Sequence, residues 1–141
     1  WCSLFKVKIA QFFSKKSSFV KTQHQIRTFA IGDIHGGLKA LLQVLNQLEI
    51  TENDTLIFMG DYVDGWSESA QVLELLMQLS QKINCVFIKG NHDVWCEDWL
   101  KEGTVNRSWY MHGGKETMDS YEGFSRNERI QHGKWSQAEN V

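Results

Sequence analysis

Apolar and polar positions between residues 27 and 101 repeat one plan three times. A short apolar run ends in glycine followed by aspartate or asparagine, within 27–33, 55–61 and 84–91. Apolar residues at helical spacing follow the first two runs, in 38–48 and 72–79, and a shorter helical pattern covers 94–101. The pattern predicts three strands, each followed by a helix, with Ser67 as the N-cap of the second helix.

The spacing of the three units predicts how the strands are joined. Gly32, Gly60 and Gly90 lie 28 and 30 residues apart, which suits strand, helix, strand units. Apolar runs without regular polar alternation, separated by amphipathic helices, favour a parallel sheet covered by helices on both faces. In such a sheet the loops at the carboxyl ends of the strands open on one edge, where ligands bind.

The pattern is weaker after residue 102. We expect a loop anchored by aromatic residues such as Trp109 and Tyr110, a short helix after Gly114, and a polar helical tail in 126–141. Length and composition predict a single domain over 26–141, preceded by a basic extension over 1–25. That extension is interpreted as loosely packed, in preference to a membrane-surface or transit-type helix.

Charge divides the chain unevenly. Residues 1–32 hold six of the 15 Lys and Arg residues and none of the 17 Asp and Glu residues. The acidic remainder argues against a nucleic-acid partner and suits a protein that binds divalent cations. No apolar run approaches the roughly 20 residues that span a bilayer, and three cysteines without a CxxC pair indicate reduced thiols. We therefore expect a cytoplasmic protein without a membrane partner.

Side chains that bind metals or move protons gather at the expected ligand-binding edge: Asp33, His35, Asp61, Asp64, Asn91 and His92. Carboxylate, imidazole and amide donors suit manganese, and also iron or zinc, better than calcium. Asp33 and His35 can bind one ion, and Asp61 can bridge it to a second ion held partly by Asn91. The residues predict two divalent cations, manganese first, that activate a water for attack on a phosphate ester.

His92 is the predicted general acid, because it follows a candidate ligand directly and can protonate a leaving alkoxide. Asp64 in the neighbouring loop is the expected anchor of its other ring nitrogen. For Asp93 a helix-cap role is favoured over metal binding. Three histidines are interpreted as surface or loop residues and not as ligands: His24, His112 and His132.

With these residues in place, the chain resembles the calcineurin-like metallophosphoesterase superfamily, and within it the bacterial serine/threonine protein phosphatases. The resemblance lies in "GDIHGG", "GDYVDG" and "GNHD", in the order and spacing of that family, and covers residues 27 to about 101. "WYMHGGKET" is similar to a tryptophan, double-glycine, threonine stretch of some bacterial members.

The resemblance implies an α/β fold: the N-terminal half of an αββα sandwich, with a parallel βαβαβ core and helices on its faces. It assigns Asp33 and His35 to one metal, and makes Asp61 the bridging ligand. Asn91 is assigned to the second metal, and His92 with Asp64 to proton delivery.

Two features depart from the family pattern. Gly65 and Trp66 follow Asp64, where the protein phosphatases usually continue with an arginine that grips phosphate. Two further histidine ligands, which the family supplies to the second metal from later strands, have no matching motif here. The chain is therefore interpreted as a C-terminally truncated domain with uncovered edge strands and with weak or no activity as a fragment.

Three functions remain open on the sequence. The leading one is metal-dependent hydrolysis of phosphate monoesters, including phosphoserine and phosphothreonine in proteins. The first alternative is hydrolysis of a dinucleoside polyphosphate, because related enzymes share these loops. The second is a truncated, catalytically inactive metal-binding protein. The expected partner of an active enzyme is a phosphorylated protein or a small phosphoester.

Overall fold

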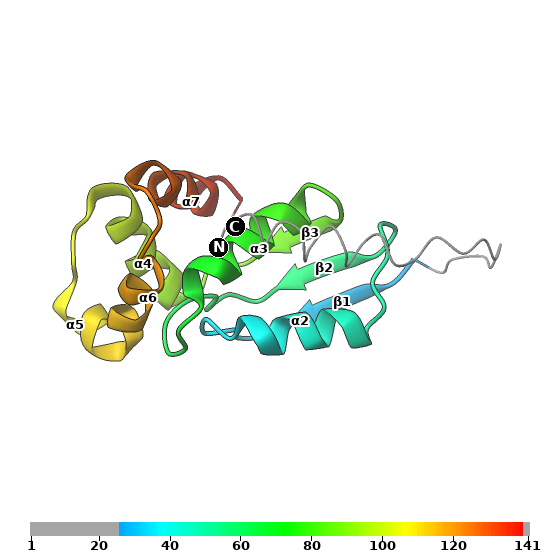
Figure 1. Ribbon diagram of the computed structural model, residues 1–141. Helices are drawn as coiled ribbons and strands as arrows, with labels where there is room; N and C mark the ends of the chain where they lie inside the picture. The colour runs from blue at the N-terminus through cyan, green and yellow to red at the C-terminus, as the bar shows by residue number, and fades with distance from the viewer. Residues whose placement is uncertain (1–25, 140–141) are drawn as a thin grey trace.

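The computed structural model describes residues 26–139, which form a small parallel sheet followed along the chain by a group of helices (Figure 1). The strands are β1 (Thr28–Ile31), β2 (Thr55–Phe58) and β3 (Asn84–Phe87), in the order β1-β2-β3. Both pairings are parallel, and Phe58 lies opposite Ile31 on one side and Phe87 on the other. The predicted parallel core is therefore confirmed, whereas the basic extension over 1–25, with His24, lies outside the described residues.

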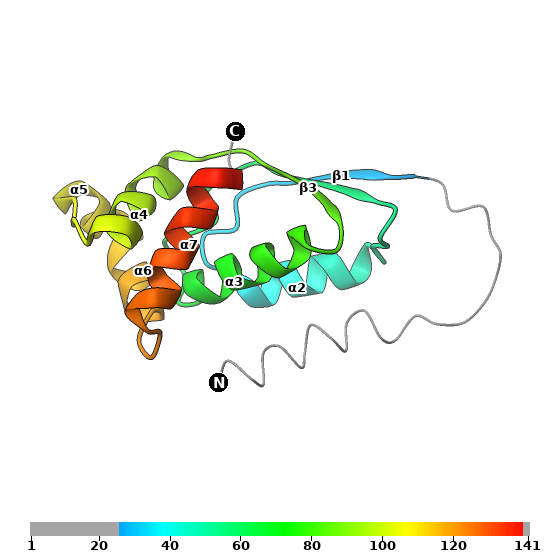
Figure 2. The same cartoon turned by 90° about the horizontal axis from the view of Figure 1, so that it is seen from above.

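Helices α2 (Leu38–Gln47) and α3 (Ser69–Ser80) make the crossovers that parallel strands require. Both lie on the same side of the sheet (Figure 2). The strand side chains on that side are shielded, and Leu56, Phe58 and Phe87 are fully or almost fully buried. The second helix begins one residue later than expected: Ser67 is exposed, and Glu68 occupies the N-cap position without a side-chain capping bond.

The expectation of helices on both faces is wrong for the described residues. Strand positions alternate between shielded and more exposed, and Ala30 and Val86 are exposed on the side opposite the helices. The reason is that the chain after β3 does not turn back over that face. The later helices continue past the carboxyl end of the strands (Figures 1 and 2).

The helical part begins with α4 (Asn91–Glu102), three residues earlier than expected, and continues through α5 (Arg107–Trp109). A wide turn, η1 (Tyr110–Gly114), leads into α6 (Lys115–Ser120), and α7 (Arg126–Glu139) packs against α4. The short helix after Gly114 is thus confirmed, and the expected anchoring loop contains α5. Between residues 26 and 139, no helix combines the length and apolar character of a membrane span.

The polar tail is more deeply packed than its composition suggests. His132 in α7 is buried, which corrects the expectation of a surface or loop position. Its Nε2 lies 3.2 Å from the Glu74 carboxylate, and its Nδ1 lies 2.7 Å from the Tyr121 hydroxyl. A polar side chain is stable in the interior when both of its hydrogen-bonding atoms find partners, and His132 meets that condition.

Candidate metal centre

The candidate ligands lie in the loops at the carboxyl ends of the strands. Asp33 and His35 follow β1, and Asp61 follows β2. The two loops are joined directly, because the backbone N–H groups of Ile34 and His35 donate to the Asp61 carbonyl at 3.0 and 2.9 Å. The parallel register therefore brings together side chains that are 26 and 28 positions apart in the sequence.

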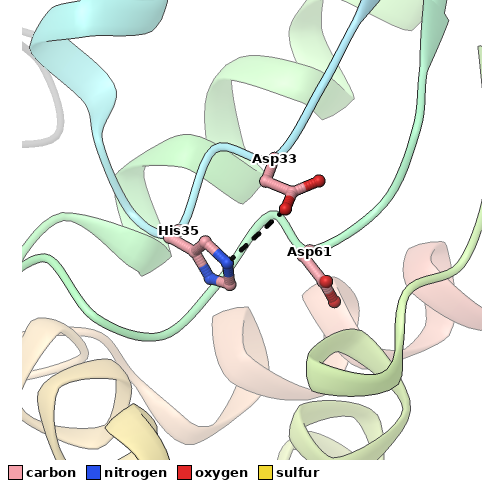
Figure 3. A group of neighbouring side chains, drawn as sticks. All are labelled: Asp33, His35 and Asp61. Atoms are coloured by element: carbon pink, nitrogen blue, oxygen red, sulfur yellow. Dashed lines mark ion pairs between the residues drawn. The ribbon is translucent and has the colours of Figure 1, made fainter.

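Asp33, His35 and Asp61 form one group that could hold a metal ion, since each offers a ligand atom within 4.8 Å of the others. Figure 3 shows the three side chains beside one another, with His35 Nε2 3.9 Å from Asp33 Oδ2. His35 Nδ1 lies 3.1 Å from the Val63 carbonyl, to which it can donate its proton. This hydrogen bond leaves the lone pair on Nε2, the atom that faces the carboxylate, available to a metal.

The backbone of the site adopts conformations that ordinary residues avoid. His35, Asp61 and Asp64 have φ angles of 47°, 51° and 72°. The left-handed region costs a non-glycine residue free energy, of order 1–3 kcal/mol where the surroundings impose it. Among residues 26–139, Glu49 is the only other non-glycine residue with positive φ, so this strain is concentrated at the candidate site.

His92 and Asp64 form the expected pair. His92 Nδ1 donates to Asp64 Oδ2 at 2.7 Å, and the Asp64 side chain is almost completely buried. The pair lies beside the metal group, because the His35 and His92 rings meet edge-on at 5.0 Å and the His92 backbone N–H donates to Asp61 Oδ1.

The remaining predicted residues have different surroundings. Asn91 is the exposed first residue of α4, and its role as a metal ligand stays a prediction. His112 is exposed and donates to the Ser108 carbonyl. Neither His112 nor the buried His132 belongs to the group formed by Asp33, His35 and Asp61 among the described residues.

Asp93 caps α4 as expected and also reaches the neighbouring loop. Its carboxylate accepts the N–H of Gly90 at 3.0 Å, of Asp61 at 2.7 Å and of Tyr62 at 2.9 Å. Burial raises the pKa of the Asp93 carboxyl to about 6, although these three hydrogen bonds act in the opposite direction. Asp93 therefore supports the loop that carries Asp61.

Sequence reasoning linked none of three residues to Asp64: Ser69, Trp109 and Thr117. Trp109 was expected only as an anchor of the loop after residue 102. The backbone N–H of Asp64 donates to both hydroxyls, and its carboxylate accepts from Trp109 and Thr117. The stretch "WYMHGGKET" was the available signal for two of them, but the partners of Trp109 and Thr117 could not be read from it.

A parallel sheet with an Asp/His group at its carboxyl edge defines an α/β protein with a candidate metal centre. Residues 26–140 match the calcineurin-like phosphoesterases, and the chain belongs to that family. The match covers both the sheet and the helices that follow it.

Curated relatives include proteins with two different activities. A serine/threonine-protein phosphatase 2 of Escherichia coli is 33% identical over 101 residues, 71% of this chain and 44% of that protein. A symmetrical bis(5'-nucleosyl)-tetraphosphatase of Proteus mirabilis is 40% identical over 68 residues, 48% of this chain and 24% of that protein. The chain thus spans less than half the length of either relative.

The fold is shared with a solved metallophosphoesterase from Sphaerobacter thermophilus. The TM-score is 0.56 at 21% identity, over 82% of this chain and 42% of that one. The predicted α/β metallophosphoesterase fold is therefore confirmed for the part of the fold that this chain covers.

Proposed function

We propose that the protein is a metal-dependent phosphoesterase that hydrolyses phosphate monoesters, including phosphoserine and phosphothreonine in proteins, and that it acts in the cytoplasm. The observation that carries the proposal is a pair formed by the buried Asp64 and the partly exposed His92, placed against a group of side chains that could hold a metal. The His92 and His35 rings lie 5.0 Å apart, so a phosphate held by the metal group would meet His92. Free thiols at Cys85 and Cys96 fit a reducing compartment.

Asp33, His35, Asp61 and Asn91 would hold two divalent cations. The donors are carboxylate oxygens, one imidazole nitrogen and one amide oxygen, a set that suits manganese, with iron or zinc as alternatives. Such ions, when bound, neutralise phosphoryl oxygens and make water a stronger nucleophile. The fit rests on the proximity of the first three side chains, whose ligand atoms lie within 4.8 Å of one another.

His92 would act as the general acid. The Asp64 carboxylate accepts a hydrogen bond from the Nδ1–H group of His92 at 2.7 Å. The other ring nitrogen, Nε2, is therefore the atom that can donate a proton to the substrate. As water adds to phosphorus and the bond to the leaving oxygen breaks, His92 donates a proton to that oxygen. The leaving group then departs as a neutral alcohol, and the hydrogen bond to the buried Asp64 carboxylate orients the ring for the transfer.

A second candidate is hydrolysis of a dinucleoside polyphosphate, favoured by the Proteus mirabilis relative at 40% identity. A third is a metal-binding protein without catalysis, because the group formed by Asp33, His35 and Asp61 could hold an ion whether or not the chain catalyses a reaction. The proposal for protein substrates rests on the Escherichia coli phosphatase, which matches 71% of this chain, whereas the Proteus mirabilis relative matches 48%.

Turnover by the purified chain with Mn²⁺ separates these functions. We expect release of phosphate from a phosphothreonine peptide to exceed cleavage of diadenosine tetraphosphate, and His92→Asn to lower kcat about 10²- to 10⁴-fold. His112→Asn is the matched control, because His112 is exposed and contacts the Ser108 carbonyl outside the metal group. Preference for the tetraphosphate would favour the second candidate. Bound Mn²⁺ without turnover of either substrate would favour the third.

A further inference from the structure

The Asp64 carboxylate is enclosed by side-chain donors on both oxygens. Oδ2 accepts from Trp109 Nε1 at 2.8 Å as well as from His92, and Oδ1 accepts from the Thr117 hydroxyl at 2.6 Å. Asp64, Trp109 and Thr117 are all fully buried. A buried carboxylate is held in one orientation when each oxygen has its own fixed donor, because rotation would cost at least one hydrogen bond.

Both added donors come from the segment that runs from α5 through α6, and they lie 45 and 53 residues away from Asp64 in the sequence. Trp109 ends α5, where the Asn106 side chain accepts its backbone N–H at 3.2 Å. Thr117 lies in α6, and its hydroxyl also accepts the Asp64 backbone N–H at 2.9 Å. The segment therefore contacts Asp64 through both backbone and side chain.

The double glycine between these donors allows the close approach. A Cβ at Gly113 would lie 2.9 Å from the Asp64 Cβ and 2.7 Å from the Gly65 nitrogen. A Cβ at Gly114 would lie 2.5 Å from the Trp109 ring. Larger residues at Gly113 and Gly114 would therefore move this segment away from Asp64. The two glycines allow the approach in which Trp109 and Thr117 donate to the Asp64 carboxylate.

We propose that Trp109 and Thr117 are positioning residues for proton delivery by His92, an inference that rests on the function proposed above. They fix the Asp64 carboxylate so that one Oδ2 lone pair receives His92 Nδ1–H, and the ring then presents Nε2 to the leaving oxygen. Without them, Asp64 can rotate and His92 can adopt orientations and tautomers that deliver no proton.

Leaving-group dependence tests this role. Trp109→Phe keeps an aromatic side chain, although a smaller one, and removes the N–H, whereas Thr117→Val keeps the shape but removes the hydroxyl. Phenolate needs protonation more than 4-nitrophenolate does, so we expect kcat for phenyl phosphate to fall about 10- to 100-fold and kcat for 4-nitrophenyl phosphate less than about 3-fold. Equal losses on the two substrates would mean a merely structural role and would overturn the proposal.

Two control variants complete the series. Trp99→Phe makes the same change in a buried tryptophan whose ring lies 5.9 Å from that of Trp109. Thr117→Ser keeps the hydroxyl. Both should retain the wild-type ratio of the two rates. If Thr117→Val does not fold, Trp109→Phe against Trp99→Phe decides the question.

A second readout needs no activity. Nitrogen-15 spectra of the metal-free chain should show the neutral His92 ring protonated at Nδ1 in the wild type, and a mixture of tautomers in Trp109→Phe and Thr117→Val. An unchanged tautomer in both variants would overturn the positioning role. A wild type inactive on both aryl phosphates would overturn the proposed function instead, and the tautomer result would still decide the role of Trp109 and Thr117.

Discussion

Asp93 shows how a single residue can hold two loops of the site in place. It belongs to the first turn of α4, yet two of its three backbone donors lie in the loop after β2. With only 3% of its surface exposed, it has no water to replace a lost partner. Backbone N–H groups that lose a buried acceptor cost about 1–3 kcal/mol each.

Replacing Asp93 by asparagine should therefore destabilise the fold, even though the two side chains have the same shape. One carboxylate oxygen becomes an NH₂ group, which faces the N–H of Gly90, Asp61 or Tyr62 as a second donor. We expect the free energy of unfolding in urea to fall by about 2 kcal/mol. Asp98→Asn, at an exposed position of the same helix, is the control and should change it by less than about 0.5 kcal/mol. Equal stability of the two variants would contradict this role of Asp93.

Sequence reasoning found residues whose neighbours along the chain already predict that they lie together. Asp33, His35 and Asp61 follow strands directly, so the sheet register alone brings them together. The contacts of Trp109 and Thr117 with Asp64 could not be predicted in this way. They join residues 45 and 53 positions apart and depend on how the helical part packs against the loop after β2. Periodicity within a helix carries no information about such a contact.

At the scale of elements, Arg27 joins the beginnings of β1 and β2. Its guanidinium donates to Asp54 Oδ1 at 3.0 Å and Oδ2 at 2.7 Å, and it also donates to the Glu49 carbonyl. The hydrogen bonds from Arg27, joined by those from Thr51, lower the pKa of the buried Asp54 carboxyl to about 2. The Arg27–Asp54 pair therefore joins β1 and β2 at their amino-terminal ends, at the opposite end of the strands from the candidate metal centre.

The low pKa of Asp54 predicts an acid-dependent loss of stability. The unfolded carboxyl has a pKa near 3.9, so the pair stabilises the fold above that pH, and the effect is lost as pH falls from about 4 to 2. We expect Asp54→Asn to be less stable than wild type by about 1 kcal/mol at pH 6, a value reduced by the partial exposure of Arg27. Urea unfolding at pH 6 and pH 2.5 should show the difference shrinking. A constant difference would contradict the lowered pKa.

The elements themselves were predictable where local pattern decides them. Leucine spacing located α2 and α3 to within a few residues, and the apolar runs located all three strands. The coverage of the sheet was not predictable in this way, because Ile57 and Val86 are apolar although they lie on the side away from α2 and α3. An apolar side chain indicates a surface suited to burial, but not which element, if any, buries it.

At the scale of the whole molecule, the candidate site lies where the sheet meets the helical part. The metal group comes from the loops after β1 and β2, and the Asp64–His92 pair is completed by α5 and α6. Each part therefore depends on the other for a working geometry. A ligand that binds this junction should stabilise the folded chain as a unit, since the unfolded chain does not bring these side chains together.

Thermal unfolding with and without Mn²⁺ tests this linkage. At 100 times its dissociation constant, an ion that binds only the folded chain adds about 2.7 kcal/mol, which corresponds to roughly 8 °C in Tm for a domain of this size. We expect EDTA to abolish this increase in Tm. Asp61→Asn should lose most of it, whereas Asp119→Asn, at an exposed position in α6, should retain it.

Ca²⁺ should raise Tm less than Mn²⁺ does, because His35 supplies an imidazole nitrogen to an otherwise oxygen-rich group. An equal Mn²⁺ shift in Asp61→Asn and Asp119→Asn would place the bound ion elsewhere on this acidic chain.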